Sequence, residues 1–489
     1  MAAEKESNSY RNILKGISLF GGVKVFEILI NLIRGKFVAL FLGPEGIGIS
    51  SIFDNISTTV SQLSSCGLNL ATVKEIASSG KTPDNLSQTI TVVRHLFLAT
   101  AVMGSLICVL FAPLLSRFSF GSDSYSSQFI FIGIAVFFII DNGGKLSILQ
   151  GLHEVKRLSK ASLVGALTGL TVGVPLYWKF GNDAIAPAIA ILAFSQNIFY
   201  RWQLYAACRN LPKANIRLTH HRPLIKKLFS LGFILLASDM IGSGCNYLLL
   251  VVIRMIGDID DVGFFQSANS VTNQMAGVVF SAMAIDYFPR LSAVASDNEE
   301  MNKVVNRQSD IIGCIIMPLA LLLILCAPLV VKILLTTRFN AIIPLLRWMA
   351  LGVVIKALGF PMGYISFAKD NKRVFFWLEG IVGNLLFLIT PILFFHWFGL
   401  TGFGYGMVVE QSLCFLIYLG VNRKLYGYRH SPESAQSCAI AVSLTSFSLL
   451  CSYIPDEAIA YSAMGILLLI SVIFCIVRLK GKIYMDSSR

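Results

Sequence analysis

The sequence predicts an all-α integral membrane protein with about fourteen transmembrane helices, twelve of them forming two parallel six-helix lobes around a central cavity. Three observations lead to this fold class. Of the 489 residues, 55% are hydrophobic and only 14% are charged, whereas soluble globular proteins contain about 25% charged residues. Apolar runs recur along the whole chain. Landmarks of the first half also recur in the second half.

Each predicted helix is an apolar run of about 20 residues or more, the length that a helix needs to cross the hydrocarbon core of a bilayer. Polar residues, glycine or proline separate the runs. The predicted spans are 13–41, 47–72, 88–116, 128–150, 158–178, 184–206, 226–254, 262–288, 308–335, 342–367, 374–397, 402–422, 435–454 and 458–477. The connections are short, so no soluble domain is expected.

The first predicted span carries a charged stripe. Lys24, Glu27, Asn31 and Arg34 are spaced three, four and three residues apart, so they share one face of a helix. A charge at bilayer depth costs roughly 2.5–3.5 kcal/mol on insertion scales, and such groups face the interior of a bundle or a wet cavity. The stripe therefore predicts a membrane helix with one wet face.

Other spans add polar groups at membrane depth. Polar residues recur at helical spacing in the second, seventh and eighth spans: Asp54, Thr58, Ser61 and Ser65, then Asp239, Ser243 and Asn246, then Asn269 and Asn273. Charged residues also fall within other predicted spans, among them Asp141, Lys145 and Lys356. For any one of these residues, a structural ion pair is as good an explanation as a functional role. The whole set favours a functional cavity, because buried ion pairs stabilise a fold poorly.

Lysines and arginines are distributed unevenly between the connections. With the N-terminus inside, the cytoplasmic loops and both tails hold most of them, and the longest loop, around 208–225, is strongly basic. This asymmetry follows the positive-inside rule and predicts that both termini are cytoplasmic. It also accounts for most of the net charge of +13, so no nucleic-acid partner is expected.

Four landmarks of the first half recur in the second half in the same order. At an offset of 215, Ile47-Gly48 matches Val262-Gly263 and Ala112-Pro113-Leu114 matches Ala327-Pro328-Leu329; at 216, Lys156-Arg157 matches Lys372-Arg373 and Pro175 matches Pro391. A duplicated unit with an even number of spans gives two parallel halves, which is a layout of transporters with the substrate site between the halves. The predicted parts are an N-lobe (1–207), a basic linker (208–225), a C-lobe (226–425) and two extra spans with a tail (426–489).

Catalytic and metal-binding patterns are absent from the sequence. The six histidines lack the mutual spacing of a metal site or a catalytic dyad, and the ten cysteines are scattered singly through apolar segments. The glycine-rich stretch 43–48 lacks the pattern of a nucleotide-binding loop and predicts a tight hairpin between the first two spans. We therefore expect no catalytic residues, no metal and no cofactor, and the chain is not expected to be an enzyme.

Three stretches resemble bacterial polysaccharide flippases, the O-antigen and lipid III translocases of the multidrug/oligosaccharidyl-lipid/polysaccharide exporter superfamily. They are LINLIRGKFVALFLGPEGIGI, GLNLATVKEIA (67–77) and LQGLHEVKR (149–157). The resemblance covers the first twelve spans. It implies a two-lobed bundle in the bacterial inner membrane that moves an undecaprenyl-diphosphate-linked oligosaccharide from the cytoplasmic to the outer leaflet by alternating access. A role in lipopolysaccharide or other surface polysaccharide biosynthesis, beside a polymerase and glycosyltransferases, is implied with it.

The resemblance also supports a role for Arg34. The related lipid II flippases have a diphosphate-binding arginine nine residues before the loop glycine, as Arg34 is before Gly43. Their other cavity arginines have no counterpart here. We expect substrate binding by Lys24, Arg34, Lys145, Lys356, Asn31 and Asn246. Candidates for binding a coupling proton or sodium ion are Glu27, Asp54, Asp141 and Asp239, and the membrane potential is another driving force.

Two other functions remain open from the residues. A multidrug or cation exporter of the same superfamily calls for a mainly acidic, aromatic cavity, and Lys24, Lys145 and Lys356 argue against it. A membrane glycosyltransferase or polymerase acting on the same lipid calls for a sizeable extracytoplasmic loop with catalytic residues, which the sequence lacks.

Overall fold

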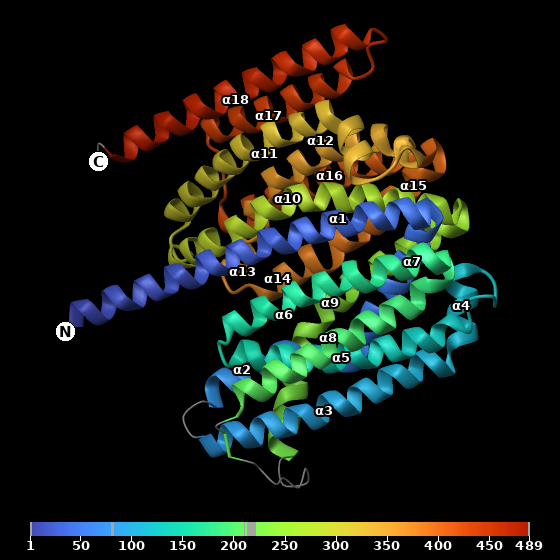
Figure 1. The fold of residues 1–489 in the computed structure, drawn as a ribbon. Coiled ribbons are helices and arrows are strands. Elements are labelled where there is room, and N and C mark those ends of the chain that lie inside the picture. The colour runs from blue at the N-terminus through green and yellow to red at the C-terminus, as the bar shows by residue number, and fades with distance from the viewer. Residues whose placement is uncertain (1, 80–82, 210, 213–221, 488–489) are drawn as a thin grey trace. The chain divides into compact units, whose positions relative to one another are not determined.

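The computed structural model describes residues 2–79, 83–209, 211–212 and 222–487, and every regular element in these ranges is a helix (Figure 1). The predicted all-α class is therefore confirmed. The chain divides into two compact units, Met1–Val251 (unit 1) and Val252–Arg489 (unit 2).

Nine segments of the described residues are long and apolar enough to cross a membrane. They are Leu29–Ser65, Pro83–Leu110, Gln128–Gly151, Lys156–Ala207, Asn298–Leu334, Thr337–Ala368, Lys372–Tyr426, Pro432–Cys451 and Glu457–Arg478. Two of them, Lys156–Ala207 and Lys372–Tyr426, each contain two of the predicted spans. The chain is thus a multi-pass membrane protein, and the count of about fourteen spans stays a prediction.

The first two predicted spans are joined in α1 (Ala2–Ser65), which is kinked at Gly43. Gly43 has φ 66° and ψ −168°, a conformation that is open essentially to glycine alone. Pro44 follows, where a fixed φ suits the start of a new helical segment. The second predicted span, 47–72, does not continue to its expected end. Cys66 (φ 49°) and Gly67 (φ 69°) interrupt it, and α2 (Leu68–Ser79) begins after them.

In unit 1, α5 packs between α3 and α8 (Figure 1). The remaining elements are α3 (Pro83–Leu110), α4 (Ala112–Phe120), α5 (Gln128–Gly151), α6 (Val155–Thr168), η1 (Gly169–Gly173), α7 (Val174–Phe180), η2 (Gly181–Ala184), α8 (Ile185–Ala207) and α9 (Arg222–Ile256), whose residues after Val251 fall in unit 2. Arg117, in the last turn of α4, pairs with Asp123 of the exposed turn that follows, through two hydrogen bonds of 2.7 and 2.6 Å. The guanidinium holds the pKa of the Asp123 carboxyl below its ordinary value.

In unit 2, α12 packs between α11 and α16, as α5 does between α3 and α8 in unit 1. The elements are α10 (Ile259–Ala293), α11 (Asn298–Leu334), η4 (Thr337–Ile342), α12 (Ile343–Gly363), α13 (Ile365–Ala368), α14 (Lys372–Phe375), η5 (Phe376–Gly383), α15 (Asn384–Phe398), η6 (Gly399–Thr401), α16 (Gly402–Tyr426), α17 (Pro432–Cys451) and α18 (Glu457–Ser487).

Local backbone geometry repeats between the two units. His153 has φ 56° and Asp370 has φ 55°, although neither is glycine. The same two hydrogen bonds close both turns: His153 N to Gln150 O (3.0 Å) and Glu154 N to Leu149 O (3.0 Å), then Asp370 N to Phe367 O (3.1 Å) and Asn371 N to Ser366 O (2.9 Å). Each turn leads into a helix with a π-helical segment, η1 or η5. This shared geometry supports the predicted duplication.

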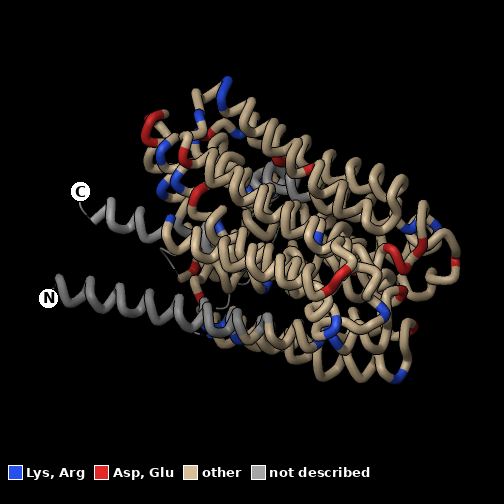
Figure 2. Tube along the Cα trace, turned by 90° about the horizontal axis from the view of Figure 1, so that it is seen from above, with Lys and Arg blue, Asp and Glu red and all other residues tan. Residues whose placement is uncertain are grey.

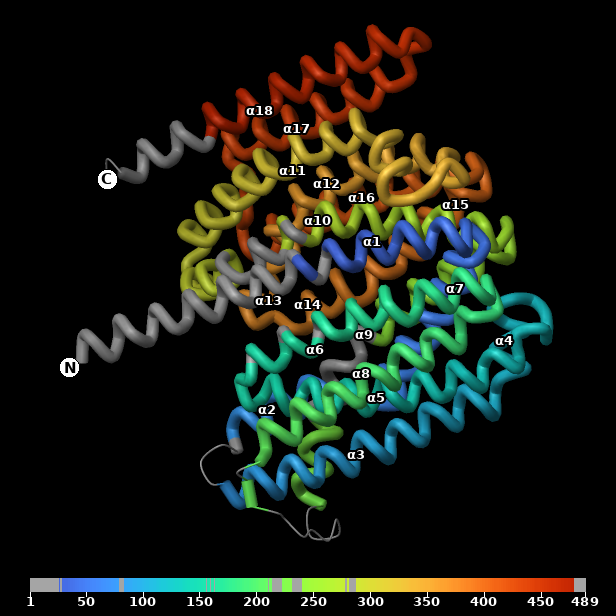
Figure 3. The backbone as a smooth tube through the Cα atoms, in the orientation of Figure 1, coloured from blue at the N-terminus to red at the C-terminus, as the bar shows by residue number. Residues whose placement is uncertain are grey.

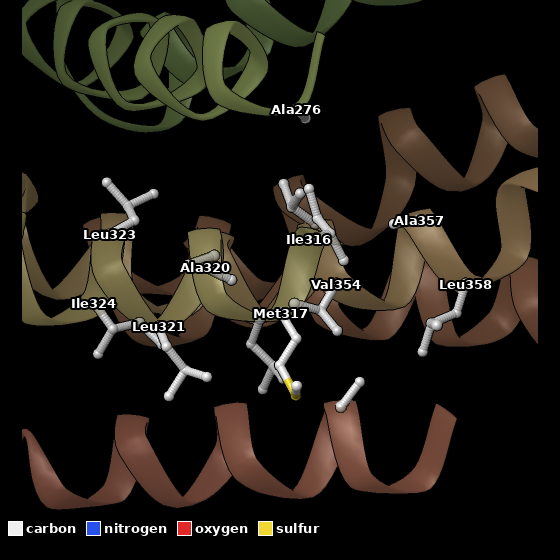
Figure 4. Close-up of a cluster of buried hydrophobic side chains, with 14 of the residues drawn as sticks. Ala276, Ile316, Met317, Ala320, Leu321, Leu323, Ile324, Val354, Ala357 and Leu358 are labelled. Carbon is white, nitrogen blue, oxygen red and sulfur yellow. The ribbon is translucent and has the colours of Figure 1, made fainter. Parts of the chain in front are cut away.

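The two helices beyond the predicted repeat are integrated into unit 2. Figure 3 shows α17 and α18 side by side along α11. Their residues Ala441 and Met464 belong to the same buried cluster as Met317 and Leu321 of α11. Figure 4 shows the centre of this cluster, where α11 and α12 interdigitate. The Cys475 thiol of α18 donates to the Cys314 carbonyl at 2.7 Å, and all ten cysteines are free.

Charged residues gather toward the ends of the helices, and few lie along their middle (Figure 2). Many large apolar side chains are exposed along the described helices, for example Leu106 of α3 and Leu469 of α18. This distribution is what a bilayer requires, because lipid replaces water around the middle of each helix.

We predict that Met464→Ala destabilises unit 2. Met464 is fully buried, so its truncation leaves a cavity that costs about 2 kcal/mol of unfolding free energy, the lower end of the usual range because lipid is as apolar as the core. Unfolding in mixed micelles measures it. Leu469→Ala, at a side chain 63% exposed on the same helix, is the control and is expected to change little. Equal effects of both changes would contradict this role of the cluster.

Candidate functional site

Arg34 lies half-buried on α1, surrounded by three other segments of unit 1. Its guanidinium donates a hydrogen bond to the Tyr177 hydroxyl of α7. It also lies close enough to Asp54, on the second segment of α1, for electrostatic attraction, and the Ser50 hydroxyl hydrogen bonds to Asp54. The first two predicted spans therefore bring one predicted cation and one predicted acid together.

Gly169 makes room for the Arg34 side chain. A Cβ atom at Gly169 would lie 3.0 Å from Arg34 Nη1 and 3.3 Å from its Cδ, closer than ordinary carbon contacts. Gly169 opens η1, the π-helical segment between α6 and α7. Such wide turns are uncommon and occur frequently at functional sites. The missing side chain lets the guanidinium lie against the helix and reach Tyr177.

Within unit 1, helix α9 contacts three other helical segments along its length. Lys227 pairs with Glu75 of α2 at 2.7 Å. Asn246 Nδ2 donates to Asn55 Oδ1 of α1 at 2.5 Å. The Tyr247 hydroxyl hydrogen bonds to Ser119 of α4 at 2.7 Å. Asn246 is thus placed beside Asn55, the residue after Asp54. These contacts link the predicted seventh span to α1, α2 and α4.

Lys145 and Asp141 lie in a second cluster of unit 1. They form an ion pair one helical turn apart on α5, and Asn197 of α8 donates to Asp141 at 2.7 Å. They line a pocket with a volume of about 790 Å³, together with Arg94 of α3 and Arg201 of α8. Lys145 is therefore grouped with other cations and not with Arg34.

Unit 2 holds a lysine between two carboxylates. Lys356 of α12 lies close enough to Glu379 of η5 and Glu410 of α16 for electrostatic attraction. Glu410 is 5% exposed and accepts a hydrogen bond from Gln411 at 2.7 Å. Tyr418 hydrogen bonds to Glu379. Two acids beside one lysine leave one carboxylate in excess.

This cluster also depends on a glycine and a π-helical segment. Glu379 lies within η5, and a Cβ atom at Gly363 of α12 would lie 2.6 Å from Glu379 Oε1. The Lys356 ammonium lies 6.0 Å from the centre of the Phe280 ring, within the range of a cation–π contact. In both units a charged side chain is therefore accommodated at a π-helical segment and against a glycine.

The remaining predicted site residues are placed as follows. The side chains of Lys24, Glu27 and Asp239 lie outside the described residues, and Asn31 is exposed on α1. Roles for Lys145 and Lys356 in substrate binding stay predictions, and each has an acid beside it. Within the described residues, no group of three or more histidine, cysteine or acidic side chains is arranged to hold a metal ion.

Several residues of these clusters were not among the predicted site residues. The sequence gives no sign that Tyr177 and Gly169 belong to a site, because tyrosine and glycine are common in apolar helices. Glu379 and Glu410 did carry a signal, since both are acids within predicted spans. Their proximity to Lys356 depends on how α12, η5 and α16 pack.

The sequence is similar to those of known proteins. A family model described as polysaccharide biosynthesis protein matches residues 37–344. The lipid III flippase of Escherichia coli (strain K12) is 20% identical over 372 residues, which cover 75% of this chain and 86% of that protein. The lipid III flippase of Shigella flexneri matches with the same identity and coverage.

Two solved structures show the same fold. The lipid II flippase MurJ, in an inward closed conformation, has a TM-score of 0.68 and 16% identity, covering 96% of this chain and 100% of that chain. An inward-facing multidrug resistance MATE family transporter of the MOP superfamily has a TM-score of 0.70 and 17% identity, covering 82% and 94%. The predicted fold and resemblance are thereby confirmed. These proteins are flippases and transporters, not enzymes, which is the class predicted here.

We predict that Gly169→Ala displaces Arg34 and lowers stability relative to Gly173→Ala. Both changes gain the same helix propensity. At Gly173 a Cβ atom would meet its nearest neighbours at 3.7 Å, an ordinary contact. The crowding at Gly169 should cost about 1 kcal/mol of unfolding free energy.

A double-mutant cycle tests the cause of that cost. In the Arg34→Ala background the difference between Gly169→Ala and Gly173→Ala should disappear, because the crowded side chain is gone. Unfolding curves of the purified variants give the four free energies. An equal penalty in both backgrounds would show that Gly169 is needed for another reason.

Proposed function

Because this chain belongs to the polysaccharide biosynthesis protein family, we propose that it is a flippase for a lipid-linked oligosaccharide. Its substrate is an undecaprenyl-diphosphate-linked repeat unit of O-antigen or another surface polysaccharide, moved from the cytoplasmic to the outer leaflet of the inner membrane. The observation that carries this proposal is Arg34, an arginine of the membrane helix α1 that lies three residues before the segment matching the family, 37–344.

The chemistry of Arg34 suits a diphosphate. A guanidinium has five N–H donors in a planar fork that matches two phosphate oxygens. Tyr177 uses part of this capacity and Asp54 balances part of the charge. The remaining donors are available to an anionic ligand. In a bilayer such charge-assisted hydrogen bonds are stronger than in water.

Polar residues near Arg34 suit the sugars. Asn31 lies three residues before Arg34 on α1, and the Asn55–Asn246 pair offers amide donors and acceptors. We assign these amides to the oligosaccharide, while the prenyl chain stays in lipid. Lys24, Lys145 and Lys356 stay candidates for substrate binding from the sequence alone, and Lys145 lies in a different cluster from Arg34.

The driving force follows from the charge of the substrate. The electrical work of moving one charge across a membrane is about 2.3 kcal/mol per 100 mV. An inside-negative potential favours outward movement of a diphosphate. Alternating access would require α9 to rearrange its contacts with α1, α2 and α4, because these contacts fix α9 along its length. We propose that both termini are cytoplasmic, and that a polymerase and glycosyltransferases act on the same lipid.

Coupling to a proton or sodium gradient is part of this proposal. Glu27, Asp54, Asp141 and Asp239 are the candidates from the sequence. Asp141 is already paired with Lys145, and Asp54 is attracted to Arg34. Glu410 and Glu379 add a stronger candidate, because one proton or sodium ion would neutralise the excess carboxylate beside Lys356.

A complementation experiment tests the function. In a bacterial host that lacks its own polysaccharide flippase but makes the matching lipid-linked repeat unit, the wild-type chain should restore surface polymer. Arg34→Ala should not, because losing charged hydrogen bonds of about 1.5–3 kcal/mol weakens substrate binding tenfold to a hundredfold. Arg34→Lys should restore it partly, since lysine keeps the charge without the fork.

Lys179→Ala is the matched control. Lys179 is exposed on α7, 5.2 Å from the ring centre of Phe180, and its loss should leave polymer unchanged. Membrane levels of every variant are measured alongside. Full restoration by Arg34→Ala would refute the role of Arg34. Efflux of cationic drugs without polymer would instead favour a multidrug exporter.

A second experiment tests the coupling site. Glu410→Gln removes one of the two carboxylates beside Lys356, so transport in proteoliposomes should lose its dependence on an imposed proton or sodium gradient. Glu299→Gln, at a side chain 84% exposed, should keep that dependence. Wild-type transport that ignores both gradients would contradict coupling, and an unchanged Glu410→Gln would remove this residue from it.

A further inference from the structure

The pocket beside Lys145 is a candidate for a second ligand. It lies among α3, α5 and α8, where α3 begins and α8 ends. The Ser87 hydroxyl of α3 hydrogen bonds to the Pro212 carbonyl beyond α8, and both residues line the pocket. The pocket belongs to a different cluster from Arg34.

Its lining is strongly cationic. Arg94 of α3, Lys145 of α5, Arg201 of α8 and Arg209 just beyond α8 all line it. Asp141 is the one carboxylate among the described lining residues. Four cations and one carboxylate leave a net charge of +3, with histidine counted as neutral.

The carboxylate of Asp141 already has partners within the protein. Asp141 pairs with Lys145 and accepts from Asn197 at 2.7 Å. Asn197 also donates to Asn142 at 2.9 Å, and Asn142 Nδ2 donates to the Ala193 carbonyl at 2.9 Å. This network fixes α5 to α8 beside the pocket. Arg94 and Arg201 lie close enough to Lys145 to repel it, a cost that a bound anion would remove.

The surface that continues from the pocket is apolar. Leu98 of α3 and Tyr205 of α8 line the pocket itself. Further along the same helices, Met103, Leu106, Ile198 and Phe194 are exposed. A cationic pocket at the end of two membrane helices with an apolar surface beside it matches the two parts of a phospholipid. A free phosphate ion would use only the first part.

From this arrangement we propose that the pocket binds the phosphate headgroup of an anionic phospholipid, with the acyl chains lying along α3 and α8. Arg94 and Arg201 bind the phosphate from opposite sides, and Arg209 adds charge at the mouth. The bound lipid relieves the repulsion between the cations and ties α3 to α8. This inference does not rest on the proposed transport activity.

Native mass spectrometry of the purified, delipidated full-length chain tests the proposal. Phosphatidylglycerol should bind saturably and phosphatidylcholine much more weakly. The double variant Arg94→Gln/Arg201→Gln should bind phosphatidylglycerol at least about tenfold more weakly, the loss expected when charged hydrogen bonds are removed. Arg209→Gln should give a smaller loss and serves as a second variant if the double variant is poorly folded.

Lys160→Gln is the matched control, because Lys160 is an exposed cation on α6 outside the pocket lining. It should bind phosphatidylglycerol as the wild type does. Equal binding by the wild type and both pocket variants would overturn the proposal. So would equal binding of phosphatidylcholine. Inorganic phosphate that displaces the lipid at low concentration would assign the pocket to a free anion. Undecaprenyl diphosphate that binds there in preference to phosphatidylglycerol would assign it to the transported substrate.

Discussion

A guanidinium within the apolar part of a membrane has to find its solvation in the protein, and the helices around Arg34 meet that requirement. Water is replaced by a tyrosine hydroxyl, an opposing carboxylate and the face of a helix. Desolvation of an unpaired charge costs several kcal/mol. The kink at Gly43 and the wide turn of η1 both help to give Arg34 its partners and its space. The kink returns the chain so that Asp54 comes near Arg34. The wide turn, with glycine at its start, leaves space for the guanidinium.

The second unit also surrounds a buried charge with protein groups, but its cluster has more negative than positive charges. There Lys356 stands between Glu379 and Glu410, again with a glycine and a π-helical segment beside the charged group. The duplicated backbone thus supports an arginine-centred cluster in unit 1 and a cluster with an extra carboxylate in unit 2. A transporter that binds an anion and uses a cation gradient needs one group of each kind.

Much of the fold followed from patterns that extend over many residues. Long apolar runs predicted membrane helices. The matches of Lys156-Arg157 with Lys372-Arg373 and of Pro175 with Pro391 predicted a duplication that the shared turns at His153 and Asp370 support. Boundaries were less well predicted. The second span was extended to 72 although Cys66 and Gly67 break it, because one residue with a positive φ leaves no trace in hydropathy. The last two helices were predicted to lie outside the repeat, and their packing was not predicted: buried side chains such as Ala441 and Met464 pack them against α11.

The sequence by itself determined that this chain enters a membrane, that its helices repeat, and that Arg34 and Asp54 are polar groups in an apolar setting. Those properties depend on composition and on spacing along one helix, where the period of 3.6 residues fixes which side chains share a face. Tertiary structure alone decided the partners. Arg34 contacts Tyr177 and Gly169, more than 130 residues away in the chain, and Lys145 joins Arg94 and Arg201 rather than Arg34. Which charges meet depends on how helices pack against one another, and apolar helix surfaces of similar composition do not specify that packing in the local sequence.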